Sequence, residues 1–152
     1  TLSDWADHMT TVFPEARVKK YIEMRGADCG DQAHINALSA FWVGLMYDQT
    51  ALDAAWDLVK DFTADTREAL RIAASEKGLQ AEAGDVKMLN LARAATKLSQ
   101  AGLQARGHGE EVFLAPLTHS LKSGTTQADR WLRDYHGTWG ASLTPIYEAS
   151  SL

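Results

Sequence analysis

The sequence predicts an α+β protein that is predominantly helical, with one or two strands followed by a bundle of about six helices. Residues 17–25 alternate between charged or polar and mostly apolar side chains, which is the period of a strand. From Ala33 onward, apolar residues instead recur every three or four positions, which is the period of a helix. The 152 residues suffice for one domain, in which we expect a strand segment (1–32) to precede a helical region (33–152).

The first expected element is a short helix through Trp5 and Met9, with Ser3 or Asp4 as its N-cap. Phe13-Pro14 ends it, because the residue before a proline is steered away from helical angles. The strand that follows needs partners for its N–H and C=O groups. The sequence offers few, so we expect the edge of an antiparallel sheet that a missing upstream segment completes. Self-association through this sheet edge is the alternative.

The helical region opens with a stripe of apolar residues on one helical face. The stripe consists of Ile35, Leu38, Phe41, Trp42 and Leu45. All five tryptophans of the chain fall at helical spacings, which predicts packing residues and not a cofactor site.

Capping residues and glycines divide the rest of the helical region. Thr50 and Thr63 are expected to cap the next two helices, and Gly78 to end the second of these. The longest helix is expected at 85–106, followed by Gly107. Three shorter elements complete the expected bundle, at 110–122, at 126–136 and from Thr144 onward.

Composition excludes several classes of protein. The net charge of −5 argues against a dedicated nucleic-acid binder, which usually carries a basic excess. No apolar run reaches the roughly 20 residues that cross a bilayer. The single cysteine, Cys29, cannot form an internal disulfide, and its place beside Gly30 favours a small structural residue over a reactive thiol. We therefore expect a cytoplasmic protein with no membrane or nucleic-acid partner.

One face of the expected strand carries an unusual row of charges. Alternate side chains share a face, so this row consists of Arg17, Lys19, Tyr21, Glu23 and Arg25. It is either a solvated sheet face with cross-strand ion pairs or a site for an anionic, metal-bound substrate. A carboxylate is the oxygen ligand that Mg²⁺ prefers, and an arginine fork suits a phosphoryl group.

Three blocks of the sequence resemble the glutamate–cysteine ligases of the plant and proteobacterial type. They are Asp4-Trp5 with Phe13-Pro14-Glu15-Ala16-Arg17 and Tyr21-Ile22-Glu23-Met24-Arg25-Gly26-Ala27-Asp28, then Ala40-Phe41-Trp42-Val43-Gly44-Leu45-Met46-Tyr47-Asp48, and more weakly Tyr135-His136-Gly137-Thr138-Trp139-Gly140. The blocks span nearly the whole chain in the family's order. The chain is similar to the C-terminal part of such an enzyme.

The resemblance implies a ligase that joins the γ-carboxyl of L-glutamate to the amine of L-cysteine with ATP and Mg²⁺, through γ-glutamyl phosphate. It implies that Glu23 is a metal ligand and that Arg25 is catalytic, contacting the transferred phosphoryl group. Arg17, Lys19 and Tyr21 are weaker candidates for substrate or nucleotide binding. Because the family's other site residues lie upstream, we expect the 152-residue chain alone to be inactive.

Two alternatives stay open on the sequence. The chain could belong to a related ATP-dependent carboxylate–amine ligase with another amine substrate, or be a non-catalytic helical interaction module. The sequence also departs from the family pattern after Asp28, where Cys29-Gly30-Asp31-Gln32 stands in place of Gly-Gly-Pro-Trp. This departure puts the shape of that loop in doubt and leaves Glu23 and Arg25 untouched.

Overall fold

The structure, a computed structural model, describes residues 1–11, 13–28 and 30–150. Its α-helices are α1 (Leu2–Met9), α2 (Gln32–Met46), α3 (Gln49–Val59), α4 (Ala64–Lys77), α5 (Met88–Arg106), α6 (Ala115–Ser123), α7 (Gln127–His136) and α8 (Thr144–Ala149). The strands are β1 (Ala16–Val18), β2 (Ile22–Met24), β3 (Glu82–Ala83) and β4 (Val86–Lys87), and two 3₁₀ turns are η1 (Gly78–Gln80) and η2 (Glu110–Leu114). The predicted α+β, mostly helical class is confirmed.

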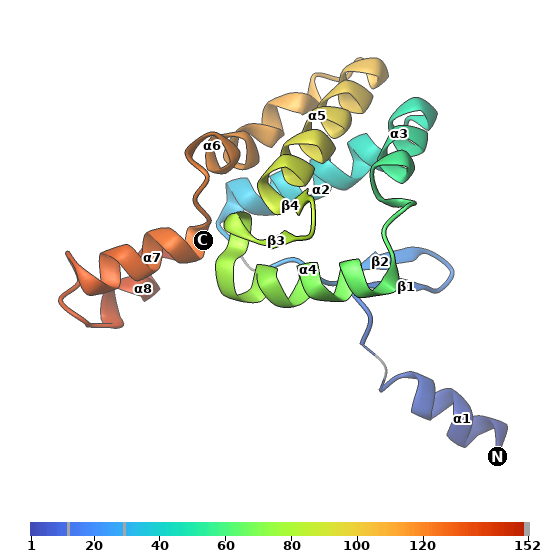
Figure 1. Cartoon of the computed structure of the whole chain (residues 1–152), viewed down its shortest axis with the longest axis horizontal. Coiled ribbons are helices and arrows are strands. Elements are labelled where there is room, and N and C mark those ends of the chain that lie inside the picture. Colours follow the sequence, from blue (N-terminus) through green and yellow to red (C-terminus); the bar gives the residue numbers. More distant parts are fainter. Residues whose placement is uncertain (12, 29, 151–152) are drawn as a thin grey trace.

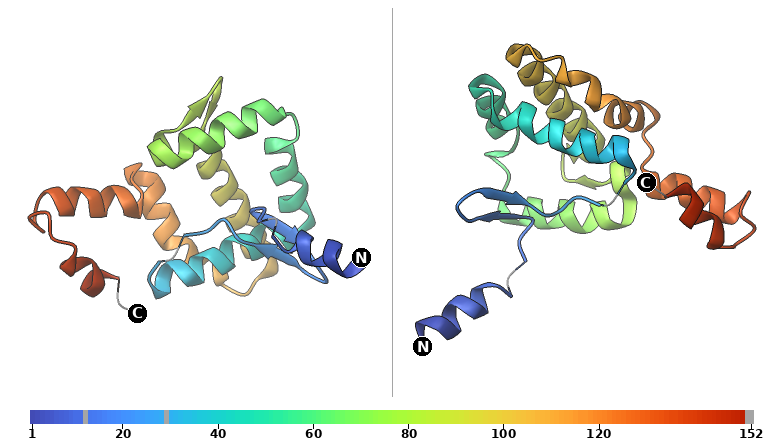
Figure 2. Two further views of the ribbon diagram at one scale, coloured as in Figure 1. Left: turned by 90° about the horizontal axis from the view of Figure 1, so that it is seen from below. Right: turned by 180° about the vertical axis from the view of Figure 1, so that it is seen from behind.

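Helices α2, α3, α5 and α6 with η2 form the packed centre of the molecule (Figure 1). Its fully or nearly fully buried residues include Ala40 of α2, Leu103 of α5 and Leu114 of η2, with Phe41 and Leu117 packed against them. By contrast, α1 extends away from this centre on one side and α7 with α8 on another (Figures 1 and 2).

Helices α2 and α5 approach each other closely because small residues line their contact. A Cβ added at Gly44 would collide with the Ser99 carbonyl oxygen, and one added at Gly102 would collide with the Gly44 carbonyl oxygen. The buried Ser99 hydroxyl donates a hydrogen bond of 2.9 Å to the Phe41 carbonyl oxygen. This bond satisfies a polar group that would otherwise be costly to bury.

The predicted single strand over 17–25 is wrong. The segment forms a hairpin in which β1 pairs antiparallel with β2, and Arg17 lies directly opposite Glu23. Residues 19–21 make the turn, and the Lys19 N–H donates a hydrogen bond of 2.8 Å to the Tyr21 carbonyl oxygen. Folding back gives the backbone groups of each half a partner within the segment itself.

Several predicted helix boundaries hold. Thr63 caps α4, Gly78 ends it, and Gly107 ends α5 in a left-handed conformation with φ of 72°. Thr126 caps α7 through its hydroxyl. Each of these residues offers the side-chain acceptor or the permissive backbone that a helix end requires.

Other predicted boundaries shift. Thr1, not Ser3 or Asp4, caps α1, and Asp48, not Thr50, caps α3. In both places the earlier residue has an oxygen within reach of the free N–H groups of the first turn. The single helix predicted at 110–122 begins as the 3₁₀ turn η2 and becomes α-helical at Ala115, just before Pro116.

The β3–β4 hairpin replaces the start of the helix predicted from Asp85. Gly84 and Asp85 form its two-residue turn, with Gly84 at a φ of 57°. A glycine tolerates this positive φ without steric cost, so the turn depends on it.

The tryptophans do not all pack in the interior. Trp42, Trp131 and Trp139 are partly buried, whereas Trp5 in α1 is 63% exposed and Trp56 in α3 is 60% exposed. The prediction is wrong for these two, because helical spacing alone does not say whether another element covers the face. No helix in the described ranges is both long and apolar enough to cross a bilayer.

Candidate functional site

An ion pair across the β1–β2 hairpin forms the centre of the candidate site. The Arg17 side chain donates from Nε at 2.9 Å and lies with Nη2 at 2.7 Å from the same Glu23 oxygen, Oε2. The two residues face each other in the register, so the backbone pairing itself brings the groups together. Both side chains are partly shielded, with exposed fractions of 22% and 32%.

Arg25 completes this charged cluster, which we define as Arg17, Glu23 and Arg25. Its Nη1 lies 4.0 Å from Glu23 Oε2, too far for a hydrogen bond. Its guanidinium carbon lies 4.7 Å from the centre of the Phe13 ring, a cation–π distance. The Arg25 N–H also donates to the Glu15 carbonyl oxygen at 2.7 Å. Arg25 is thus positioned by an aromatic ring and its backbone, and its hydrogen-bonding edge is not consumed by Glu23.

Lys19 and Tyr21 do not join the charged cluster. Both lie in the hairpin turn and both are exposed, Tyr21 to 61%. In a continuous strand they would sit between Arg17 and Glu23 on one face, but the turn removes them from it. The predicted row of five is therefore corrected to a cluster of three.

The charged cluster keeps Glu23 ionised. The hydrogen bond from Arg17 holds the pKa of the Glu23 carboxyl below its usual value, and the charges of Arg17, Arg25 and Lys19 act in the same direction, against the opposing effect of desolvation. Two cations and one carboxylate leave one net positive charge. The cluster can therefore attract an anion at neutral pH.

The cluster can supply one ligand to a cation. The Arg17 hydrogen bond and the shortest contacts of Arg17 and Arg25 all reach Glu23 Oε2, and no hydrogen bond from the described residues reaches Oε1. An ionised carboxylate is the type of oxygen ligand that Mg²⁺ takes. The described part of the chain contains no group of three or more metal-ligating side chains. Glu23 is thus one ligand of an incomplete set.

A largely apolar cavity of about 640 Å³ lies beside the cluster, on the other side of β2. Met24, which points away from Glu23 in the strand, lines it together with Phe41 and Trp42 of α2. Its polar lining includes His34 and Ser120. Sequence reasoning missed this cavity, although the apolar alternation around Met24 and the apolar stripe of α2 mark two of its walls.

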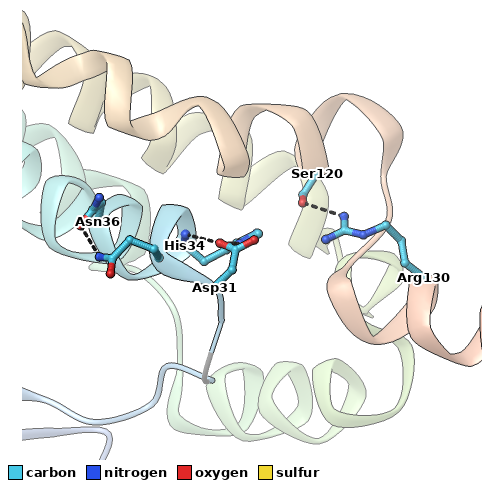
Figure 3. A network of polar contacts seen from close by, with 6 residues as sticks. Asp31, His34, Asn36, Ser120 and Arg130 are labelled. Carbon is cyan, nitrogen blue, oxygen red and sulfur yellow. Dashed lines mark hydrogen bonds and ion pairs between the residues drawn. The ribbon is translucent and has the colours of Figure 1, made fainter. Parts of the chain in front are cut away.

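In the loop that departs from the family pattern, Asp31 is the N-cap of α2. Asp31 accepts a hydrogen bond of 2.9 Å from the His34 N–H, and the His34 ring nitrogen Nδ1 lies 2.8 Å from the same carboxylate oxygen (Figure 3). These bonds hold the pKa of the Asp31 carboxyl below its usual value, the backbone bond from His34 foremost. Across the cavity, Arg130 Nη1 donates to Ser120 Oγ at 3.5 Å. Cys29 lies outside the described residues, so its predicted structural role stays a prediction.

Comparison with known proteins identifies the class. The family described as glutamate-cysteine ligase family 2 matches residues 1–149, nearly the full length of the chain. The chain therefore belongs to this family of ligases. The family resemblance inferred from the sequence blocks is confirmed.

Individual relatives agree with this assignment. The chain is 43% identical over 148 residues to the chloroplastic glutamate–cysteine ligase of Nicotiana tabacum, covering 97% of this chain and 28% of the relative. It is 42% identical over 146 residues to the corresponding Arabidopsis thaliana protein, covering 96% and 28%. With glutamate–cysteine ligase A of Oryza sativa subsp. indica it shares 42% over 148 residues, covering 97% and 30%. The chain thus spans less than a third of the length of these relatives.

The relatives also correct the predicted location. All three are named chloroplastic, so the prediction of a cytoplasmic protein is wrong. That prediction rested on a single cysteine and the lack of an apolar span, and neither feature separates a cytosolic enzyme from an organellar one.

Proposed function

We propose that the complete protein joins the γ-carboxyl of L-glutamate to the amine of L-cysteine, with ATP as co-substrate and Mg²⁺ as metal. This chain supplies one side of the active site. The observation that carries the proposal is the family match over residues 1–149, in a chain whose Glu23 and Arg25 lie in one charged cluster. The relatives named above support the choice of substrates, because each is called a glutamate–cysteine ligase.

Glu23 and Arg25 have different roles in this proposal. The Glu23 carboxylate is a ligand for Mg²⁺, which when bound offsets negative charge on the phosphate oxygens. Arg25 contacts the phosphoryl group as it moves from ATP to the γ-carboxylate oxygen of glutamate, releasing ADP. The cysteine amine then attacks the γ-glutamyl phosphate and expels inorganic phosphate. Phosphoryl transfer depends mainly on positioning and charge neutralisation, which an arginine fork provides.

The geometry of Arg25 supports this role. Glu23 Oε2 is already engaged by two nitrogens of Arg17, and Arg25 stands back from it at 4.0 Å. The Arg25 guanidinium carbon lies over the Phe13 ring, 4.7 Å from its centre, and the Arg25 guanidinium makes no hydrogen bond to Glu23. Arg25 therefore needs no rearrangement of a tight ion pair before it can bind a phosphoryl oxygen.

Kinetics of the full-length enzyme test the role of Arg25. We expect Arg25→Ala to reduce cysteine-dependent ADP release by about 100-fold or more, the usual loss when a transition-state donor is removed. Arg71→Ala is the matched control, since Arg71 is an exposed arginine of α4 that pairs with Glu68. It should leave turnover unchanged. Full activity of Arg25→Ala would overturn the phosphoryl role.

Two further measurements define the activity itself. A panel of amines in place of cysteine separates glutamate–cysteine ligase from a ligase with another amine substrate. The purified 152-residue chain should show no turnover. Its described part holds no group of three or more metal-ligating side chains that could complete a metal site with Glu23. Turnover by that chain, free of contaminating enzyme, would contradict the proposal that the active site is shared with the rest of the protein.

A further inference from the structure

One face of the β1–β2 hairpin is apolar and lies behind the charged cluster. The register pairs Val18 with Ile22 and Ala16 with Met24. Because side chains alternate along a strand, these four residues lie on the face opposite that of the charged cluster. Val18 is 84% exposed and Ile22 is 53% exposed. A two-stranded hairpin is at best marginally stable in water, so this face needs another element packed on it.

The cavity beside the hairpin continues this apolar face. Met24, the next residue along from Ile22 on the same face, lines the cavity of about 640 Å³. Native interiors hold few voids larger than a water molecule, and a contiguous exposed apolar patch marks a contact surface. We define the apolar surface as Val18, Ile22 and Met24 of the hairpin together with the cavity walls Leu38 and Trp42 of α2 and Leu121 of α6.

The substrates of the proposed reaction do not fit the apolar surface. ATP, L-glutamate and L-cysteine all carry charged groups, and burying a charge without a partner is costly. Glu15 and Asp28 line the cavity, whereas no lysine or arginine is among the described residues that line it. A phosphate or carboxylate group would therefore meet like charges there. Uncharged side chains of a protein segment fit these walls better.

We propose that an apolar segment from the rest of the same polypeptide packs on the apolar surface and fills the cavity. This chain matches only 28% to 30% of the length of the relatives named above, so more than two thirds of such a protein lies outside it. A segment joined to the chain through the backbone is present at a high effective concentration. The contact is face to face, unlike strand pairing at the sheet edge, and the charged cluster stays on the opposite face.

A second copy of the chain is a poorer occupant. Most homodimers are two-fold symmetric, so the same patch meets itself across the interface. A cavity at the centre of such an interface would face another cavity and stay unfilled. A segment of the same polypeptide is under no such restriction.

Thiol labelling of the purified full-length protein tests the inference without measuring turnover. Ile22→Cys and Leu38→Cys, made one at a time, place a thiol on the hairpin face and in the cavity wall. The measured quantity is the rate of reaction with a maleimide, corrected for the wild-type cysteines and divided by the rate of the same variant unfolded in urea. We expect both thiols to react at least about 100-fold more slowly in the folded protein, because a covered thiol reacts only when its cover opens. This ratio should not depend on protein concentration.

Leu52→Cys is the matched control. Leu52 in α3 is 38% exposed and Leu38 is 36% exposed, but Leu52 lies outside the apolar surface. Its thiol should react less than about tenfold more slowly than in the unfolded protein, because no local opening is needed to reach a partly exposed site. Val18→Cys and Leu121→Cys replace Ile22→Cys and Leu38→Cys where those variants do not fold.

Each other outcome overturns the inference. Rapid labelling of Ile22→Cys or Leu38→Cys means that the polypeptide itself does not cover the apolar surface, which leaves it to a separate protein or a small ligand. Protection that rises with protein concentration assigns the surface to a second copy. Equal protection of Leu52→Cys means that the cover is not specific to this surface. None of these outcomes depends on turnover, so the proposed function is tested separately.

Discussion

The hairpin and the helical centre are built in opposite ways. The β1–β2 hairpin has strands of three residues each, and none of its residues is fully buried. In the centre, α2 and α5 touch through glycine and serine, and Leu103 and Ser99 are fully enclosed. The charges proposed to act in catalysis thus lie on an element with little packing of its own. Under the proposed function, stability and chemistry are therefore divided between two parts of one short chain.

The largest effect that this division predicts comes from disturbing the helical centre alone. Gly102→Ala should place a methyl group against the Gly44 carbonyl oxygen, which is backbone and cannot rotate away. We expect a loss of about 3 kcal/mol in the free energy of unfolding, the upper range for overpacked cores. Urea denaturation of the full-length protein measures it.

Ala101→Ser, at the preceding exposed position of α5, is the control and should cost less than about 0.5 kcal/mol. A Gly102→Ala protein as stable as the wild type would show that α2 and α5 can separate without penalty. The close contact would then not be what stabilises the centre.

A change of intermediate size addresses the hairpin side. Phe13→Leu removes the ring beneath Arg25 but keeps an apolar side chain. We expect turnover to fall about fivefold, corresponding to roughly 1 kcal/mol for a cation–π contact. Stability should hardly change, because Phe13 is 70% exposed.

Tyr47→Leu is the matched control for Phe13→Leu. It removes a similar contact, Arg106 over the Tyr47 ring at 5.6 Å, in the helical region. Turnover should stay at the wild-type level in this variant. Equal losses in both variants would mean that the two regions do not divide chemistry and stability as described.

The smallest expected effect concerns pH and the start of α7. Asp129 accepts hydrogen bonds from the N–H and the hydroxyl of Thr126, and these bonds hold the pKa of the Asp129 carboxyl below its ordinary value of 3.8. A carboxylate with a lowered pKa in the folded state adds stability that is present above its ordinary pKa. That stability is lost as pH falls through the folded value, below 3.8.

Asp129→Asn should therefore weaken the dependence of the free energy of unfolding on pH. Between about pH 6 and pH 3 the wild type should lose more stability than the variant, by less than about 1 kcal/mol for a cap on an exposed helix. Urea midpoints of both proteins at each pH give the difference. A larger loss in the variant would contradict the expected sign of the effect.

The parts of the fold that depend on local chemistry could be predicted from the sequence. Thr63, Gly78, Gly107 and Thr126 mark helix ends because a cap needs only a side-chain oxygen or a permissive backbone nearby. Gly84-Asp85 also marks the turn of the β3–β4 hairpin by local chemistry alone. The predicted helix from Asp85 is wrong there because it extends the helical period of α5 backwards through β4. The turn at 19–21 carries no glycine, proline or asparagine, so nothing local marked it.

The candidate site could be predicted in part. Alternation along the segment placed Arg17, Glu23 and Arg25 on one face, and the structure retains that. In one continuous strand, however, about six residues would separate Arg17 from Glu23 by about 20 Å. The hairpin brings their charged groups to 2.7 Å. Which side chains pair therefore depends on where the chain reverses direction, and side-chain alternation does not predict the position of that turn.

Helix α2 runs from the loop after the β1–β2 hairpin into the packed helical centre. It begins after its cap Asp31, in the loop that follows the hairpin, and its Gly44 sits in the close contact with α5. Those two positions are separated by about thirteen residues, or about 20 Å of helix, so a rotation of about 5° at the contact would carry the first turn by about 2 Å. Displacements of about 1 Å can cost about 100-fold in rate. A small tilt of α2 at Gly44 would therefore be magnified at its first turn, where His34 lines the cavity together with Met24.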